Sequence, residues 1–175
     1  MSFSEPDKII ASINLSKDDH VADIGAGTGF YSFAAAKAVG PSGRVFALDV
    51  QKDLLERLKK EATHLGIGNI TTVWVDAEKP NGTRLRDHSI HVAIVANILF
   101  QVEDKDGLMN EIQRILTREG RVLVVDWTES FGGLGPSFDQ VFNQQAATDL
   151  FIKYGFHVQA TVEAGAHHYG LVFQK

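Results

Sequence analysis

The stretch that most constrains this chain lies near its beginning, at residues 21–29, and reads VADIGAGTG. A short apolar run carries an acid, Asp23, and glycine then occupies every second position from 25 to 29. Residues 30–37 have the composition of a helix. Glycines permit a sharp turn and let a ligand approach the main chain, and a helix that begins after such a turn offers unpaired N–H groups. The pattern predicts a strand, a tight glycine turn and a helix around a ligand site.

The spacing of these glycines separates two kinds of nucleotide site. The dinucleotide fingerprint is G-x-G-x-x-G, and Phe30 stands where its third glycine belongs. The register therefore does not fit NAD. A glycine turn by itself also fits a purely structural strand-to-helix connection, so the assignment of a ligand site depends on the rest of the chain.

Length and composition indicate one soluble domain spanning residues 1–175. The chain is 44% apolar and 22% charged, close to the globular average. A formal net charge of −5, without a Lys/Arg cluster, argues against a nucleic-acid partner. No apolar run is long enough to insert in a membrane, and the first residues lack a targeting pattern, so we expect a cytoplasmic protein. The absence of cysteine excludes disulfides and thiolate metal sites, and we expect no metal.

Hydrophobic patterning predicts strands that alternate with helices along most of the chain. Helices are expected at 7–15, 30–37, 51–65, 105–117 and 138–154, and strands at 21–24, 44–50, 69–76, 90–97, 120–127, 156–162 and 169–174. This alternation predicts a parallel α/β sheet with right-handed crossovers. The last two strands have no helix between them, which predicts that they pair in antiparallel fashion.

This order of elements, with D-x-G-x-G-x-G at the end of the first strand, resembles the class I methyltransferases that depend on S-adenosylmethionine (SAM). The resemblance implies a Rossmann-like fold with a seven-stranded, mostly parallel sheet of order 3-2-1-4-5-7-6 and helices on both faces. More narrowly, residues 21–29, 121–127, 155–156 and 167–173 are similar to small proteins that resemble the ubiquinone/menaquinone-biosynthesis methyltransferases. The implied cofactor is SAM.

Ligands of open α/β sheets bind outside the carboxyl ends of the strands, where the strand order reverses, which here is between the first and fourth strands. The resemblance implies that Asp23 accepts a hydrogen bond from the methionine ammonium of SAM. It also implies that Gly25, Ala26 and Gly27 pass close to the amino-acid and ribose parts.

Acids also end the second and third strands. A carboxylate at Asp49 can accept both ribose hydroxyls and repels a 2′-phosphate. By resemblance, Asp76 accepts from the adenine amine, the Ala77 N–H reaches a ring nitrogen, Val50 covers the adenine face, and Asn97 lines the methionine side and the path to the acceptor. Taken singly, Asp49 or Asp76 is also explained as a helix cap or turn acid.

Two adjacent histidines, His167 and His168, are the candidate catalytic residues. The predicted topology returns the last hairpin to the cofactor edge of the sheet, where an imidazole can act on the acceptor as a base or donor. Exposed or structural roles and metal ligation are the alternatives, although adjacent histidines on a strand face opposite sides and rarely share a metal. Phe100, Trp127 and Phe131 fit either an aromatic acceptor pocket or ordinary core.

The sequence therefore predicts a SAM-dependent methyltransferase with a small-molecule methyl acceptor. The chain after Asn97 lacks the Asn-Pro-Pro-Tyr type of sequence, which argues against methylation of nucleic-acid bases or amides. Without a large insertion between the fifth and sixth strands, the acceptor pocket is shallow, or is completed by the N-terminal segment or by the second subunit of a homodimer. The alternatives are a non-catalytic SAM-binding or regulatory module and, as a weaker one, a nicotinamide-dependent oxidoreductase.

Overall fold

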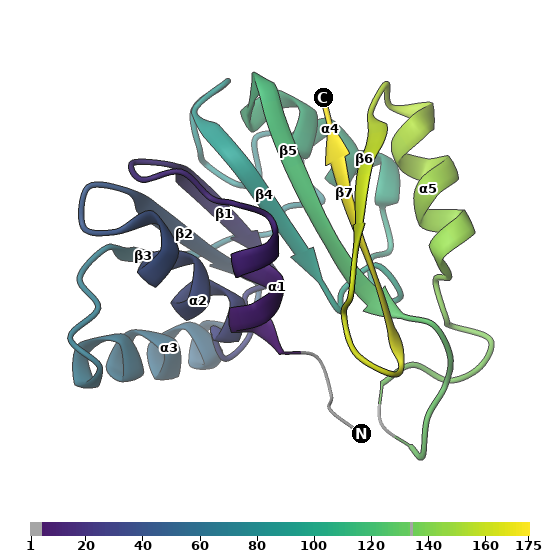
Figure 1. Cartoon of the computed structure of the whole chain (residues 1–175), viewed down its shortest axis with the longest axis horizontal. Coiled ribbons are helices and arrows are strands. Elements are labelled where there is room, and N and C mark those ends of the chain that lie inside the picture. The colour runs from purple at the N-terminus through teal and green to yellow at the C-terminus, as the bar shows by residue number, and fades with distance from the viewer. Residues whose placement is uncertain (1–4, 134) are drawn as a thin grey trace.

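Seven strands form one sheet in the order β3-β2-β1-β4-β5-β7-β6 (Figure 1). The structure is a computed structural model, which describes residues 5–133 and 135–175. The strands are β1 (His20–Ile24), β2 (Arg44–Asp49), β3 (Ile70–Trp74), β4 (Ile90–Ala96), β5 (Leu116–Trp127), β6 (His157–Val162) and β7 (His168–Gln174). Among the described strands, β7 runs antiparallel to β5 and to β6, and the other neighbouring strands are parallel. The predicted fold class and strand order are confirmed.

Helices cover both faces of this sheet. They are α1 (Pro6–Ser12), α2 (Phe30–Val39), α3 (Lys52–His64), α4 (Lys105–Ile115) and α5 (Gln144–Lys153). The apolar side chains of α1 and α2 pack with one face of the sheet, and those of α4 and α5 pack with the other. Figure 1 shows α1 in front of the sheet, beside α2, with α5 along the β6 edge.

Alternation along β1 explains why an acid lies in this interior. Val21 and Asp23 face the side of α1 and α2, whereas Ala22 and Ile24 face the side of α4. All four residues are buried, as expected for a central parallel strand covered on both faces.

Two helix boundaries differ from the prediction. The last helix begins at Gln144 rather than at residue 138, because the Asn143 side chain caps it by accepting from the Ala146 N–H at 2.9 Å. The first helix ends at Ser12 rather than at residue 15, and Asn14 follows with φ +50°. The apolar pattern continues into the neighbouring loops, so both predicted helices were too long.

The fourth helix and the fifth strand also meet at a different point. The helix ends at Ile115, and β5 begins at Leu116 rather than at residue 120. Leu116 pairs with Ile90 of β4.

None of the helices in the described part of the chain combines the length and the apolar character that crossing a membrane requires.

Candidate functional site

A cavity of about 630 Å³ lies at the carboxyl ends of β1 to β4, where the strand order reverses. This volume lies within the range of small-molecule and cofactor sites, roughly 300–1,000 Å³. All nine residues predicted to bind the cofactor line the cavity: Asp23, Gly25, Ala26, Gly27, Asp49, Val50, Asp76, Ala77 and Asn97. The fold therefore brings together residues that are spread over 75 positions of the sequence, from 23 to 97.

The glycine turn after β1 is packed so closely that side chains have no room at two of its positions. A Cβ on Gly25 would lie 2.5 Å from the Ile98 side chain, and one on Gly29 would lie 2.6 Å from Leu58. Both glycines have positive φ, +72° and +90°. The N–H groups of Gly25 and Ala26 donate to the Leu48 carbonyl at 2.8 and 2.9 Å, which fixes the turn against the end of β2.

Asp49 ties the end of β2 to this turn and to the start of α3. Its Oδ2 accepts from the Gly27 N–H and its Oδ1 accepts from the Gln51 N–H, both at 2.8 Å. Each carboxylate oxygen has a second lone-pair direction, so both can still accept from a ligand hydroxyl. The side chain is held in one orientation at the cavity wall.

Asp23 is almost completely buried, and a helix side chain supports it. Its Oδ2 accepts from the Ser32 hydroxyl of α2 at 2.5 Å. Burial raises the pKa of Asp23 to about 6, against the opposing effect of the Ser32 hydrogen bonds. A cationic group at this position would favour the ionised form and lower the pKa. Sequence reasoning missed Ser32, which nothing in the local pattern distinguishes from an ordinary helix serine.

The adenine side of the predicted site is more open. Asp76 Oδ1 accepts from the Glu78 N–H at 2.9 Å, and the side chain of Asp76 is 43% exposed. Val50 is 59% exposed, and its carbonyl accepts from the Trp74 indole N–H at 2.9 Å. An exposed valine beside the cavity leaves an apolar surface free to cover a planar ring.

Asn97 contributes a buried polar atom at the opposite end of the cavity. Its backbone has φ +58°, and its N–H donates to the Val125 carbonyl at 2.8 Å. The side-chain Oδ1 is buried and has no hydrogen-bond partner among the described residues. Because buried oxygens nearly always accept a hydrogen bond, this atom fits a ligand that brings an N–H or O–H donor, such as the ammonium of SAM.

The charge of the lining is one-sided. Its four carboxylates are Asp23, Asp49, Asp76 and Glu78, and none of the described residues that line it is Lys, Arg or His. Such a wall favours a cationic ligand and disfavours a pyrophosphate. The cavity therefore fits SAM, with its sulfonium and ammonium charges, and fits a dinucleotide poorly.

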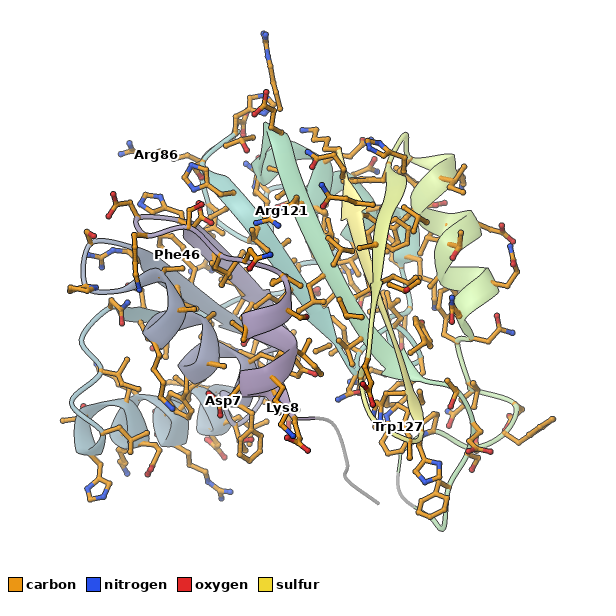
Figure 2. The ribbon with its side chains drawn as sticks, in the orientation of Figure 1. Asp7, Lys8, Phe46, Arg86, Arg121 and Trp127 are labelled. Atoms are coloured by element: carbon orange, nitrogen blue, oxygen red, sulfur yellow. The ribbon has the colours of Figure 1, made fainter. Side chains whose placement is uncertain are left out.

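The two predicted catalytic histidines lie at the same edge of the sheet but are not among the residues that line this cavity. His168 pairs with Trp127 across β5 and β7, and their ring centroids are 4.3 Å apart. Figure 2 shows Trp127 at the end of β5, beside the turn between β6 and β7. Burial, together with the neighbouring His167, lowers the pKa of His168, so this ring is neutral at physiological pH. Its Nδ1 is buried without a hydrogen-bond partner among the described residues.

His167 has different surroundings. Its Nδ1 lies 2.8 Å from Oε1 of Glu129, and its ring stacks on Phe131 with the centroids 3.8 Å apart. Sequence reasoning missed Glu129, because the loop after β5 carries no pattern that places its side chains. Within residues 5–133 and 135–175, no three His, Cys, Asp or Glu side chains form a group that could hold a metal ion.

The family model for a methyltransferase domain matches residues 15–163 of this chain. The ubiquinone/menaquinone biosynthesis C-methyltransferase UbiE of Pseudoalteromonas translucida is 32% identical over 121 residues, which are 69% of this chain and 47% of that protein. UbiE of Haemophilus ducreyi is 28% identical over 145 residues, 82% of this chain and 50% of that protein. The chain thus spans about half the length of the curated relatives it matches.

Solved structures with the same fold agree with the family match. A SAM-dependent methyltransferase from Aquifex aeolicus superposes with a TM-score of 0.88 at 23% identity, covering 98% of this chain and 90% of that one. The [4+2]-cyclase SpnF superposes with a TM-score of 0.80 at 14% identity, covering 97% and 79%. The chain belongs to the methyltransferase-domain family, and the class and cofactor predicted from the sequence, a methyltransferase that uses SAM, are confirmed at the level of that family.

Proposed function

We propose that this chain transfers a methyl group from SAM to a small-molecule acceptor. The observation that carries the proposal is the single cavity in which acids from the ends of three strands, the glycine turn and the unpartnered Asn97 oxygen converge. In this proposal Asp49 accepts from the ribose hydroxyls and Asp76 from the adenine amine. Asp23 and Asn97 accept from the ammonium group at the other end.

SAM supplies a methyl group that is already activated on a positively charged sulfonium. The main task of the chain is therefore to hold the donor and orient the acceptor in line with it, away from water. The carboxylates of the lining stabilise the cationic donor, and Asn97 holds its amino-acid end beside the acceptor path. A small acceptor is supported by the acidic lining and the net charge of −5, which disfavour a polyanion.

His167 and His168 act on the acceptor side in this proposal. The Glu129 carboxylate lies 2.8 Å from Nδ1 of His167 and holds the ring in one orientation, which suits a base that takes a proton from the acceptor. The buried His168, whose pKa is lowered, packs beside Trp127 and has a structural role rather than moving a proton.

A non-catalytic module that binds SAM is the alternative. The histidines lie outside the cavity lining, and the match to a [4+2]-cyclase illustrates that one fold serves different reactions. Two experiments separate the possibilities. Calorimetric titration with S-adenosylhomocysteine and NADH tests the cofactor, and transfer of label from methyl-labelled SAM to a panel of small phenols, amines and quinols tests turnover. Binding of S-adenosylhomocysteine without transfer to any acceptor favours the alternative, and binding of NADH instead contradicts both.

A further inference from the structure

One buried acid near the cavity has no role in the proposed chemistry. Asp126, at the end of β5, is 0% exposed. Its Oδ2 accepts from the Leu99 N–H at 2.9 Å, and its Oδ1 accepts from the Trp127 N–H at 2.8 Å. Burial raises the pKa of Asp126 to about 6, opposed by hydrogen bonds from the backbone of Trp127, Leu99 and Ile98. Burying a carboxyl group costs free energy, which the hydrogen bonds from these backbone amides offset.

The Leu99 amide belongs to the segment that follows β4, residues 97–102, which we call the post-β4 loop. Its residues that line the cavity are Asn97, Ile98, Gln101 and Val102. The Ile98 side chain packs directly against Gly25, so a shift of the loop would change the packing on the glycine turn. Leu99 itself is fully buried beneath the loop.

Two consecutive residues of β5, Val125 and Asp126, anchor this loop. The Asn97 N–H donates to the Val125 carbonyl, and the Leu99 N–H donates to the Asp126 carboxylate. The first bond is the ordinary ladder between neighbouring strands, whereas the second uses a side chain and fixes the chain where the ladder has ended. The turn at Asn97, with its positive φ, lies between these two bonds.

We propose that Asp126 is a positioning residue for the cofactor, which acts through the Leu99 amide to hold the post-β4 loop as the wall that receives the amino-acid part of SAM. The inference rests on the proposed function. It assigns Asp126 no contact with the ligand, because the side chain is covered by the loop that it anchors and is absent from the cavity lining.

The position of the loop predicts which part of the ligand depends on Asp126. The adenosine end of the proposed site is formed by Asp49 and Asp76, at the ends of β2 and β3, and neither of these residues belongs to the post-β4 loop. The methionine end lies at β4, where Asn97 and Ile98 stand. Loss of the anchor should therefore weaken binding of a ligand that carries the amino-acid part and spare a ligand that lacks it.

The experiment compares S-adenosylhomocysteine with 5′-methylthioadenosine, which lacks the amino-acid part, by calorimetry on the full chain. For Asp126→Ala, we expect the Kd of S-adenosylhomocysteine to rise at least tenfold and the Kd of 5′-methylthioadenosine to stay within twofold. Asp126→Asn keeps one carbonyl oxygen as an acceptor, so it should recover part of the loss. Phe151→Leu is the matched control, because it destabilises the core between α5 and β7 away from the cavity and should change neither affinity.

Equal weakening of both ligands, or no change in either, would overturn the inference. If the wild-type chain binds neither S-adenosylhomocysteine nor SAM, the proposed function fails instead. Hydrogen exchange at the Leu99 amide, measured without ligand, then tests the anchor by itself. We expect faster exchange in Asp126→Leu, which keeps a branched side chain but removes both acceptor oxygens, and an unchanged rate would contradict the role of Asp126 even if Asp126→Ala does not fold.

Discussion

Oδ2 of Asp49 accepts a hydrogen bond from the N–H of Gly27 at 2.8 Å, so the acid that ends β2 and the glycine turn that follows β1 form one rigid corner of the cavity. These residues are 22 positions apart in sequence. The parallel pairing of β1 with β2 brings them together, since it aligns the carboxyl ends of the two strands. A ligand that bonds to Asp49 is thereby placed against the main chain of the turn.

Replacing Asp49 with Ala should weaken binding of S-adenosylhomocysteine by about 1–3 kcal/mol, the cost of losing a charged hydrogen-bond partner. Isothermal titration calorimetry measures this as a Kd about 5- to 150-fold higher. Asp53→Ala is the control, because Asp53 is an exposed acid in the first turn of α3. If both variants bind like the wild type, the ribose site does not lie at Asp49.

Replacing Gly25 with Ala should reduce both stability and cofactor affinity. The new Cβ would lie 2.5 Å from the Ile98 side chain, and the alanine would have to adopt the left-handed backbone conformation of Gly25, φ +72°. Gly66→Ala has nearly the same φ, +68°, with no atom within 4 Å, so it isolates the conformational cost of about 1–2 kcal/mol. Urea unfolding should show an additional loss of about 1–3 kcal/mol for Gly25→Ala, from overpacking. Equal losses in the two variants would mean that Ile98 moves aside freely.

The stability of the free protein should fall as pH rises from about 4 to about 6. Asp23 and Asp126 have pKa values raised to about 6 by burial, so the folded state holds protons that the unfolded state releases above about 3.8. The stabilisation is complete below pH 3.8 and is lost as pH rises through 6, with each group accounting for about 3 kcal/mol. Urea unfolding at several pH values should show a clearly smaller fall in Asp23→Asn. A fall of the same size in that variant would contradict the assignment to Asp23.

The ion pair between Glu111 and Arg114 on α4 should give the stability of the protein the opposite pH dependence. Burial disfavours ionisation of Glu111, but hydrogen bonds from Arg114, Thr83 and Asn81 outweigh it and lower the pKa of Glu111 to about 2. The stabilisation is present above pH 4.5 and is lost as pH falls through 2. Glu111→Gln should lower the free energy of unfolding at pH 7 by about 1.5–3 kcal/mol, the worth of hydrogen bonds to a charged group. Glu56→Gln, on the exposed face of α3, should be neutral.

The two histidines should respond differently to substitution. With an acceptor that must lose a proton, His167→Gln should reduce kcat by about 10²–10⁴-fold while the Kd of S-adenosylhomocysteine stays unchanged, because a proton acceptor is lost and the cofactor cavity is not touched. Glu129→Gln should cause part of the same loss of kcat, because the His167 ring loses the carboxylate that orients it. His168→Gln should act mainly on stability, because His168 packs against Trp127. An NMR titration provides a separate check: the His168 ring should titrate below 6.5.

Local patterns predicted the succession of strands and helices because it depends on short-range chemistry, whereas most of the cofactor residues were implied by the resemblance to class I methyltransferases. The glycine spacing at 25, 27 and 29 requires a turn, and apolar runs of strand length separated by helices require a parallel sheet. Parallel strands align their carboxyl ends, so acids that follow successive strands meet at one edge. The nine predicted cofactor residues line one cavity for this reason.

The tertiary structure alone decided how individual side chains are held. Ser32 beneath Asp23, Glu129 beside His167 and the Leu99 amide on Asp126 are contacts between segments whose approach depends on packing rather than on spacing. The start of α5 at Gln144 was likewise decided by the Asn143 cap, which competes with an apolar pattern that continues through residue 142. The sequence by itself determined the succession of strands and helices and which residues reach the rim of the sheet, and the resemblance to class I methyltransferases implied the order of the strands. Which of these residues are buried, anchored or free to meet a ligand was decided by the packed interior, because hydrogen bonds and pKa shifts depend on neighbours that are distant in sequence.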